Sequence, residues 1–158
     1  MKKTITYKRL QGFDLMATNY LIKNDFFTPA EKNENGQVTK AGFFTNKAET
    51  RLVKNIKNII KQANVHFDKY KEEIGDIYDN LCLEDPKTKA LLYNANGSHQ
   101  LDREGTKKAK EQVKALSEKE IEINIRITDG DFDDLTSEEK EAFNGIVIPE
   151  FKTEEELE

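Results

Sequence analysis

The sequence predicts an α+β fold with one long helix over residues 46–83, several short helices and a small, mainly antiparallel sheet. Three observations predict this class. Apolar residues recur at helical spacing through 46–83, isoleucines alternate with polar residues over 121–127, and Asn-Gly pairs mark tight turns at 35–36 and 96–97. A chain of 158 residues is long enough for one hydrophobic core. We therefore expect a single domain over residues 1–151, followed by an acidic, disordered tail over residues 152–158.

Before the long helix, the sequence predicts a strand over residues 4–10 and a helix over residues 13–23. Residues 24–45 are rich in turn-forming residues and contain the pairs Phe26-Phe27 and Phe43-Phe44, so we expect a link that its aromatic side chains hold down. The alternative is a small hairpin that closes at Asn35-Gly36, with Val38 on the returning strand.

The long helix carries an apolar stripe, which is its most regular feature. Spacings that alternate between three and four residues define the stripe. After Ala63 a second step of four residues interrupts the heptad frame, and this interruption argues against a long two-stranded supercoil. No glycine or proline breaks the run before Gly75. The members of the apolar stripe are Leu52, Ile56, Ile59, Ala63, Phe67, Tyr70, Ile74, Ile77 and Leu81, with Ile60 at its edge.

Asp85-Pro86 ends the long helix, because proline lacks the backbone N–H donor and disfavours helix in the residue before it. A hairpin follows, with strands over residues 90–93 and 98–101 around the Asn96-Gly97 turn. Asp102 is placed to cap a helix that ends near Ser117.

Residues 121–127 form the clearest predicted strand, because every second residue is isoleucine and the residues between are polar. Thr136 and Glu139 have the spacing of a capping box at the start of a short helix, which Asn144-Gly145 would end. Residues 146–148 are then expected to return as a strand before Pro149.

The charges divide the chain into a basic part and an acidic part. Residues 1–71 hold 14 Lys/Arg against 6 Asp/Glu, a net +8, whereas residues 72–158 hold 11 against 24, a net −13. Such a distribution suits a protein that meets a polyanion with one surface and a basic protein with another. It would also suit self-association.

The long helix carries a basic stripe opposite its apolar stripe. The basic stripe consists of Lys47, Arg51, Lys54, Lys57 and Lys61, and these residues are the candidate nucleic-acid-binding set. Glu72, Asp76 and Asp79 continue the same face as an acidic, candidate protein-binding set. Cations near the N-terminus and anions near the C-terminus are the reverse of what the helix dipole favours, so helix stability does not explain their order. The alternative interpretation is a solvated charged face.

No pattern in the sequence predicts catalysis or a metal site. Asp129, Asp131 and Asp133 match the start of a calcium-binding loop, but the required glycine and the closing glutamate are missing. His66 and His99 have no cysteine or carboxylate partner at metal-ligand spacing, and we expect both to be structural. Cys82 lies between leucines and is expected to be a buried thiol. We therefore expect no enzyme activity, catalytic residue, cofactor, metal or small-molecule substrate.

The longest apolar run is too short to cross a bilayer, and the first residues lack the apolar core of a signal peptide. We therefore expect a protein without a membrane partner, located in the cytoplasm of its host cell. A homo-oligomer that packs through the apolar stripe is also compatible with the sequence.

Four features of residues 46–148 occur together: KYKEEI at 69–74, the hairpin around Asn96-Gly97, ALSEKEIEI at 115–123 and LTSEE at 135–139. In these features the chain resembles an uncharacterised family of small proteins encoded by phages and prophages. The first 45 residues have no counterpart in that family, and the family offers no catalytic residues to transfer. The resemblance implies a mobile-element origin, and hence a bacterial host cell.

Two functional hypotheses follow. The first is a non-enzymatic inhibitor of host defence, of the anti-CRISPR type, which binds an effector nuclease, its guide RNA or both through the basic stripe and the acidic set. The second is an accessory protein of virion morphogenesis that acts through helix packing of the apolar stripe. Specific binders of single-stranded RNA usually place aromatic residues beside basic ones, and the sequence places none in the basic stripe, which argues for backbone contact or for no RNA contact.

Overall fold

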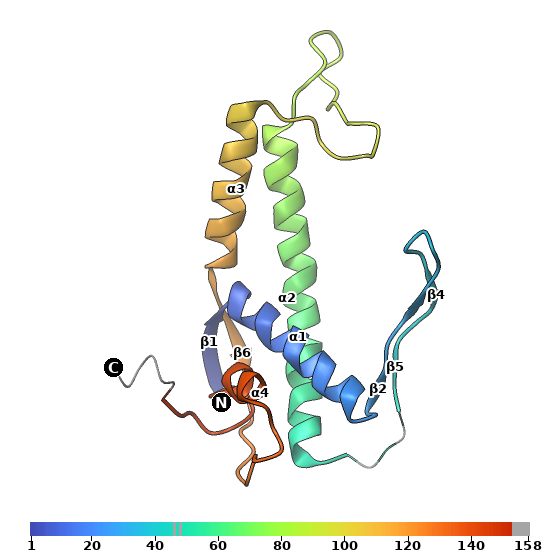
Figure 1. Ribbon diagram of the computed structural model, residues 1–158. Helices are drawn as coiled ribbons and strands as arrows, with labels where there is room; N and C mark the ends of the chain where they lie inside the picture. Colours follow the sequence, from blue (N-terminus) through green and yellow to red (C-terminus); the bar gives the residue numbers. More distant parts are fainter. Residues whose placement is uncertain (46, 48, 153–158) are drawn as a thin grey trace. The chain divides into compact units, whose positions relative to one another are not determined.

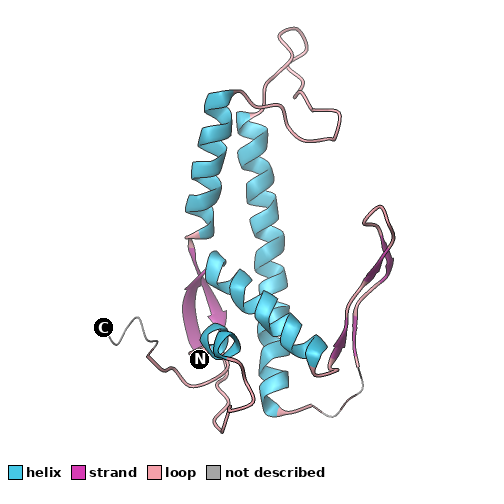
Figure 2. Ribbon diagram, viewed as in Figure 1, coloured by secondary structure: helices cyan, strands magenta, loops and turns pink. Residues whose placement is uncertain are grey.

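The computed structural model describes residues 1–45, 47 and 49–152, and their fold is α+β, as the sequence predicts (Figures 1 and 2). Three pairs of short strands accompany the helices of this described part. In chain order the elements are β1 (Lys2–Thr6), α1 (Tyr7–Lys23), β2 (Phe27–Thr28), β3 (Glu31–Lys32), β4 (Val38–Lys40), β5 (Phe43–Phe44), α2 (Arg51–Leu81), α3 (Arg103–Ser117), β6 (Glu120–Asn124) and α4 (Ser137–Phe143).

The chain forms two compact units, which are described separately. The first unit comprises Met1–Ile5, Arg9–Ala63 and Glu122–Glu158, and the second comprises Thr6–Lys8 and Asn64–Ile121. The long helix α2 supplies its residues up to Ala63 to the first unit and the remainder to the second. The expectation of a single domain stays a prediction. The expected tail begins at Lys152, which is exposed, and residues 153–158 lie outside the described part.

The core of the first unit is built on α1, α4 and the beginning of α2. The Phe13 and Phe143 rings lie 5.5 Å apart between centroids, and Tyr20 meets Phe143 edge-on at 5.8 Å. Ile56 and Ile59 of α2 are completely buried in the same unit. Aromatic pairs in this geometry stabilise the fold beyond the free energy that burial of the rings contributes.

The predicted strand over residues 4–10 is wrong beyond Thr6, because α1 already begins at Tyr7. Tyr7, Leu10, Phe13, Ala17 and Leu21 are all buried, at the spacing of one helix face. The strand was predicted because Ile5 and Tyr7 are apolar and two residues apart, but Ile5 belongs to β1 and Tyr7 begins α1. Two residues are too few to distinguish strand periodicity from helix periodicity.

β6 confirms the predicted strand of residues 121–127 only over residues 121–124, and the prediction is wrong for residues 125–127. β6 pairs with β1 in a two-stranded sheet. Ile123 and Ile125 are buried, as the alternation predicts, although the strand ends before Ile125. The predicted strand over residues 146–148 is wrong. Their backbone N–H groups all donate to the carbonyl oxygen of Phe143, so this buried segment continues the turn after α4 instead of joining a sheet.

The alternative interpretation of residues 24–45 is confirmed, because these residues form a hairpin around Asn35-Gly36. We call residues 27–44 the phenylalanine hairpin. β3 pairs antiparallel with β4 near the turn, and β2 pairs antiparallel with β5 at the base, where Phe27 lies opposite Phe44. Gly36 adopts φ +78°, a conformation that glycine tolerates without strain. The hairpin is labelled by β2, β4 and β5 in Figure 1.

The long helix is confirmed, but it begins at Arg51 and ends at Leu81 instead of spanning residues 46–83. Thr50 explains the start, because its hydroxyl accepts a hydrogen bond from the Val53 N–H and its carbonyl accepts one from Lys54. Asn46, the expected first residue, lies outside the described part. From Leu52 to Ala63 the apolar stripe is buried except at its edge residue Ile60, which is half-buried. Beyond Ala63 only Tyr70 is buried, and the other members are half-buried.

The second unit contains the rest of α2, the loops around residues 82–101 and α3. Asp102 caps α3 as predicted, since its carboxylate accepts a hydrogen bond from Gly105 N–H at 2.6 Å. The Asn96-Gly97 turn is confirmed, with Gly97 at φ +86°, but its predicted strands are reduced to isolated bridges. Cys82 is a buried thiol, as expected.

The capping box at the start of α4 is confirmed. Thr136 and Glu139 exchange side-chain to backbone hydrogen bonds, and Lys23 of α1 donates to the Glu139 carboxylate at 3.1 Å. Burial raises the pKa of this carboxyl, but the hydrogen bonds from Thr136 and Lys23 outweigh burial and leave the pKa below its ordinary value. Glu139 thus ties α4 to α1 while it is ionised.

Replacing Phe143 with alanine should destabilise the protein by about 3–5 kcal/mol, because the side chain is 0% exposed and its loss leaves a cavity against Phe13. Chemical denaturation would measure the change. Leu15→Ala is the control, since Leu15 is 63% exposed and should change stability by less than about 0.5 kcal/mol. Equal effects of the two substitutions would contradict the proposed core.

The stabilising effect of Glu139 should depend on pH in the acidic range. A folded-state pKa below the unfolded one means that ionised Glu139 stabilises the fold above the unfolded pKa, and that this stabilisation is lost as the pH falls through the folded pKa. Glu139→Gln should therefore be less stable than the wild type at neutral pH. The difference should shrink with acidification in denaturation curves recorded at successive pH values, and a difference independent of pH would contradict this assignment.

Candidate nucleic-acid interface

The structure separates the basic stripe into residues held by neighbours and residues exposed on α2. Lys47 lies before the helix, so its predicted helical position is wrong. Its ammonium group donates to the Asn24 carbonyl at 2.8 Å and lies 5.0 Å from the centroid of the Phe26 ring. Lys57 forms an ion pair with Glu49 and lies 4.3 Å from the centroid of the Phe44 ring. Both cations hold the segments around the phenylalanine hairpin in place.

Arg51, Lys54 and Lys61 are exposed on α2. Among the described residues, none of the three forms an ion pair. Their charges are therefore available to a partner. Lys54 also belongs to a hollow of the first unit, which the sequence did not predict.

This hollow, which we call the basic groove, has a volume of about 430 Å³ and lies between α2 and the chain that leaves β6. Lys54 and Asn58 contribute from α2, while Asn124 and Arg126 contribute from the end of β6 and the residues after it. The full lining is Met1, Lys54, Asn55, Asn58, Asn124, Ile125 and Arg126. It contains two cationic side chains and three amides but no carboxylate, although 30 of the 158 residues are acidic.

Two side-chain contacts hold the walls of the basic groove together. Gln62 of α2 accepts a hydrogen bond from the Asn124 N–H at 2.8 Å and donates one to the Asn124 carbonyl at 2.7 Å. Asn55 is buried and donates to the Thr128 hydroxyl at 2.7 Å. Because these bonds attach the chain on both sides of Arg126 to α2, the segments that carry the two cations are held together before any ligand arrives.

The basic groove has the composition of a site for phosphate oxygens. Lysine offers a compact charge, arginine offers a planar set of donors, and asparagine amides add neutral donors. The sequence placed Arg126 on the outward face of a strand, but it could not show that this face meets Lys54, because 72 residues separate the two. No local pattern carries that information.

The candidate acidic set lies in the second unit. Glu72 and Asp76 are exposed on α2. Asp79 is also exposed, but its carboxylate lies 2.6 Å from the His99 ring nitrogen. The fold thus gives His99 a carboxylate neighbour that lies outside any metal-ligand spacing in the sequence, and Tyr78 stacks on His99 at 5.9 Å. Asp79 fixes the loop that carries His99, which leaves Glu72 and Asp76 as the accessible members.

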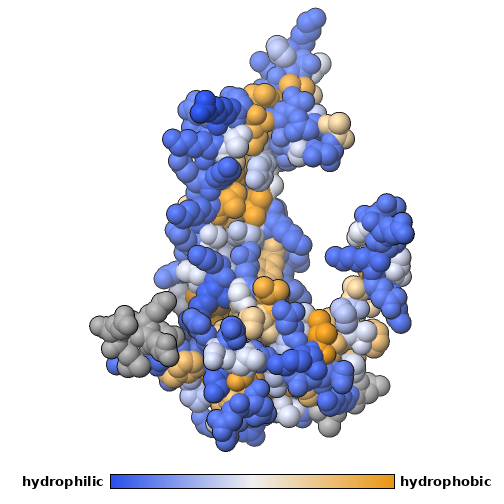
Figure 3. All heavy atoms as spheres, in the orientation of Figure 1, coloured by the Kyte–Doolittle hydropathy of each residue, from blue (hydrophilic) through white to orange (hydrophobic). Residues whose placement is uncertain are grey.

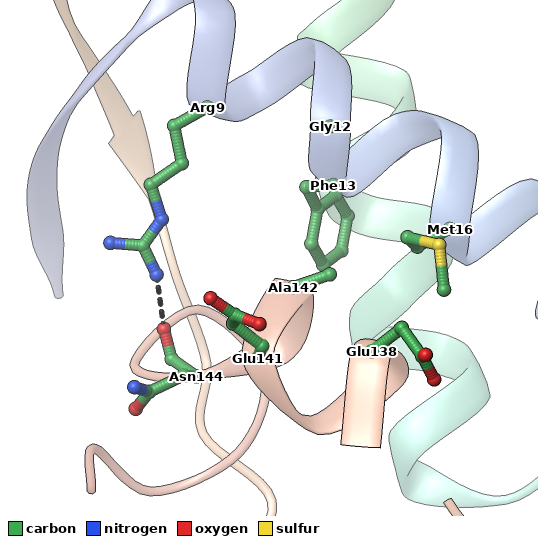
Figure 4. Close-up of a pocket in the computed structure, with 8 residues that line it drawn as sticks. All are labelled: Arg9, Gly12, Phe13, Met16, Glu138, Glu141, Ala142 and Asn144. Carbon is green, nitrogen blue, oxygen red and sulfur yellow. Dashed lines mark hydrogen bonds between the residues drawn. The ribbon is translucent and has the colours of Figure 1, made fainter. Parts of the chain in front are cut away.

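A second hollow of the first unit, about 430 Å³, lies between α1 and α4. Figure 4 shows Arg9 and Asn144 at one end, where the guanidinium group donates to the Asn144 carbonyl, and Met16 and Glu138 at the other. Phe13 and Ala142 lie between these ends. The carboxylates of this hollow make it less suited to a polyanion than the basic groove.

Comparison of the chain with protein-family models, curated proteins and solved structures found no match. Within the described ranges, no group of three or more His, Cys, Asp or Glu side chains is arranged to hold a metal ion. In the same ranges, none of the helices combines the length and the apolar character needed to cross a membrane. The basic groove is thus the best-defined candidate interface, on its geometry and charge alone.

Removing the Gln62 side chain should loosen the basic groove. Gln62→Ala eliminates the two hydrogen bonds to Asn124, each worth about 0.5–1.5 kcal/mol, and should accelerate hydrogen exchange at the Asn124 amide. Exchange measured by NMR would test this expectation. Gln112→Ala on the exposed face of α3 is the control, and an unchanged Asn124 exchange rate in Gln62→Ala would show that the groove does not depend on this contact.

Proposed function

We propose that this protein is a non-enzymatic inhibitor of host defence, of the anti-CRISPR type, which binds a nucleoprotein effector through the phosphates of its nucleic acid. The observation that carries the proposal is the basic groove, where Lys54 and Arg126 converge from separate elements and no carboxylate lines the wall. The phage resemblance of residues 46–148 supports the biological setting. An inhibitor of this kind acts by occupying a surface and needs no chemistry of its own.

The expected contacts are to the backbone of the nucleic acid. Lys54 and Arg126 would each replace counterions on a phosphate, which makes the affinity depend on salt. Asn58 and Asn124 would add hydrogen bonds to phosphate or sugar oxygens. Such contacts do not distinguish sequences, so the inhibitor would recognise a guide RNA or a nucleic-acid channel by its charge and shape.

The accessible acidic residues of the second unit extend this proposal to the protein part of the effector. Glu72 and Asp76 are exposed. The second unit as a whole, residues 6–8 and 64–121, holds 11 Lys/Arg against 12 Asp/Glu, so the acidic surface is local to this face of α2. Surfaces that bind nucleic acid in an effector are basic, and an acidic surface is complementary to them. The two parts of the chain would then bind RNA and protein of one target.

A second candidate function, an accessory role in virion morphogenesis, has its own supporting observation. Phe67, Ile74 and Ile77 of the apolar stripe are half-buried in the second unit. Figure 3 shows hydrophobic surface, in orange, over the part of α2 that lies beside α3 in the view of Figure 1. Packing against another copy or another phage component would cover this surface.

Replacing both cations of the basic groove should weaken RNA binding and flatten its salt dependence. The slope of log affinity against log salt should fall by about 2 in Lys54→Ala/Arg126→Ala, because two phosphate contacts are lost. Fluorescence anisotropy with an RNA oligonucleotide at several salt concentrations would measure the slope. Lys107→Ala/Lys110→Ala removes the same charge from exposed positions of α3 and should leave the slope unchanged. Equal slopes for the two double variants would contradict the proposed interface.

Affinity capture from a lysate with an active CRISPR system separates the two candidate functions. The inhibitor proposal expects the tagged protein to recover an effector with its guide RNA, and Lys54→Ala/Arg126→Ala to lose them. Recovery of phage structural proteins alone would reject inhibition and favour assembly.

A further inference from the structure

We infer that the phenylalanine hairpin is a stacking platform for unpaired bases, and that the nucleic acid bound at the basic groove is therefore single-stranded. This inference rests on the proposed function and narrows its ligand from nucleic acids in general to single strands. Phe43 and Phe44 are successive residues of β5 and face opposite sides of the strand, so each would stack on its own base. Lys54 and Arg126 of the basic groove would hold the phosphates.

The phenylalanine hairpin exposes aromatic rings beside cations. Phe43 is 46% exposed and Phe44 is 43% exposed, whereas Phe26, just before the hairpin, is 8% exposed and belongs to the core. The ammonium group of Lys40 lies 5.7 Å from the centroid of the Phe43 ring, and that of Lys57 lies 4.3 Å from the centroid of the Phe44 ring. Each exposed ring therefore has a positive charge within the range of a cation–π interaction.

The packing of the hairpin does not account for this exposure. Phe44 meets its cross-strand neighbour Phe27 edge to face at 5.0 Å, which supports the base of the hairpin. Phe43 lies opposite Thr28 and has no ring contact with another aromatic residue among those described. Two adjacent phenylalanines that remain almost half exposed forgo part of the free energy that burial of their rings would contribute. A bound base would cover the exposed parts of the rings.

The platform and the basic groove are close along α2. Lys57, beneath Phe44, follows Lys54 by three residues, and side chains at this spacing are neighbours on a helix, with Cβ atoms about 5–6 Å apart. A strand whose phosphates contact Lys54 can therefore reach Phe44 within about one turn of α2, past the ion pair of Lys57 with Glu49. Aromatic rings beside a cationic track are the arrangement that proteins use to hold single strands without base specificity.

The sequence-based expectation that no aromatic residue accompanies the basic stripe is therefore wrong. Phe44 precedes Lys57 by 13 residues and belongs to another element, so neither helical nor strand periodicity connects them. The fold of the hairpin brings the ring over the lysine. The absence of aromatic neighbours in the basic stripe had argued against recognition of unpaired bases, and the contact removes that objection.

Two RNA ligands test the inference: a single strand of about 10 nucleotides, within the range of known binding sites, and the duplex of the same sequence. Phe43→Leu/Phe44→Leu keeps apolar side chains but removes the π faces. It should bind the single strand about tenfold more weakly, because base stacking on an aromatic ring contributes about 1–3 kcal/mol. The wild type should bind the duplex more weakly than the single strand, since paired bases are not available for stacking. The two substitutions should therefore leave the affinity for the duplex unchanged.

Control variants separate stacking from folding and from charge. Val38→Ala removes an exposed apolar side chain from the same hairpin and should bind both ligands as the wild type does. Phe43→Leu alone leaves the Phe27–Phe44 contact intact, so it reports on stacking even where the double variant perturbs the hairpin. Single-strand affinity should fall in Phe43→Leu, and the Phe43 ring protons of the wild type should shift upfield when RNA binds.

Unchanged single-strand affinity in both leucine variants would overturn the stacking platform. The proposed function would survive that result if Lys54→Ala/Arg126→Ala still weakened binding. If the wild type bound neither RNA ligand, the proposed function would fail together with the inference. The two failures are thus distinguishable in one set of titrations.

Discussion

Burial of the apolar stripe at the start of α2 sets the geometry on which the basic groove depends. Leu52, Ile56, Ile59 and Ala63 are all buried in the first unit, and a helix with one face fixed in this way cannot rotate about its axis. The opposite face, with Lys54 and Asn58, must then point away from the core. Gln62 and Asn55 complete the arrangement, because their hydrogen bonds attach the segment that carries Arg126 to the same helix. The interface thus follows from a packing constraint.

Local patterns predicted the elements whose stability is local. The capping box of Thr136 and Glu139, the cap at Asp102 and the Asn-Gly turns are all present, since each depends on residues a few positions apart. The helix start at Thr50 could have been predicted from the same cap chemistry, because threonine is a common N-cap residue. The strand over residues 146–148 was wrong because an apolar segment this short is compatible with a turn as well as a strand.

The candidate site depends on contacts that no local pattern contains. The sequence placed Lys54 and Arg126 correctly on outward faces, but their convergence requires the pairing of β6 with β1 and the contact of Gln62 with Asn124. It also grouped five cations into one stripe, although Lys47 lies before the helix and Lys57 is paired with Glu49. A charge pattern identifies which residues are basic, while the tertiary structure decides which charges remain available.

The central claim is that nucleic acid binds the first unit at the basic groove, and backbone NMR of the labelled protein tests it most directly. Titration with a single-stranded RNA should shift the amide resonances of Asn58, Asn124 and Arg126, and then those of Phe43 and Phe44. Amides of α3, which also carries lysines, should remain unchanged. Shifts confined to α3 or to residues 69–81, or no shift at all, would contradict the account.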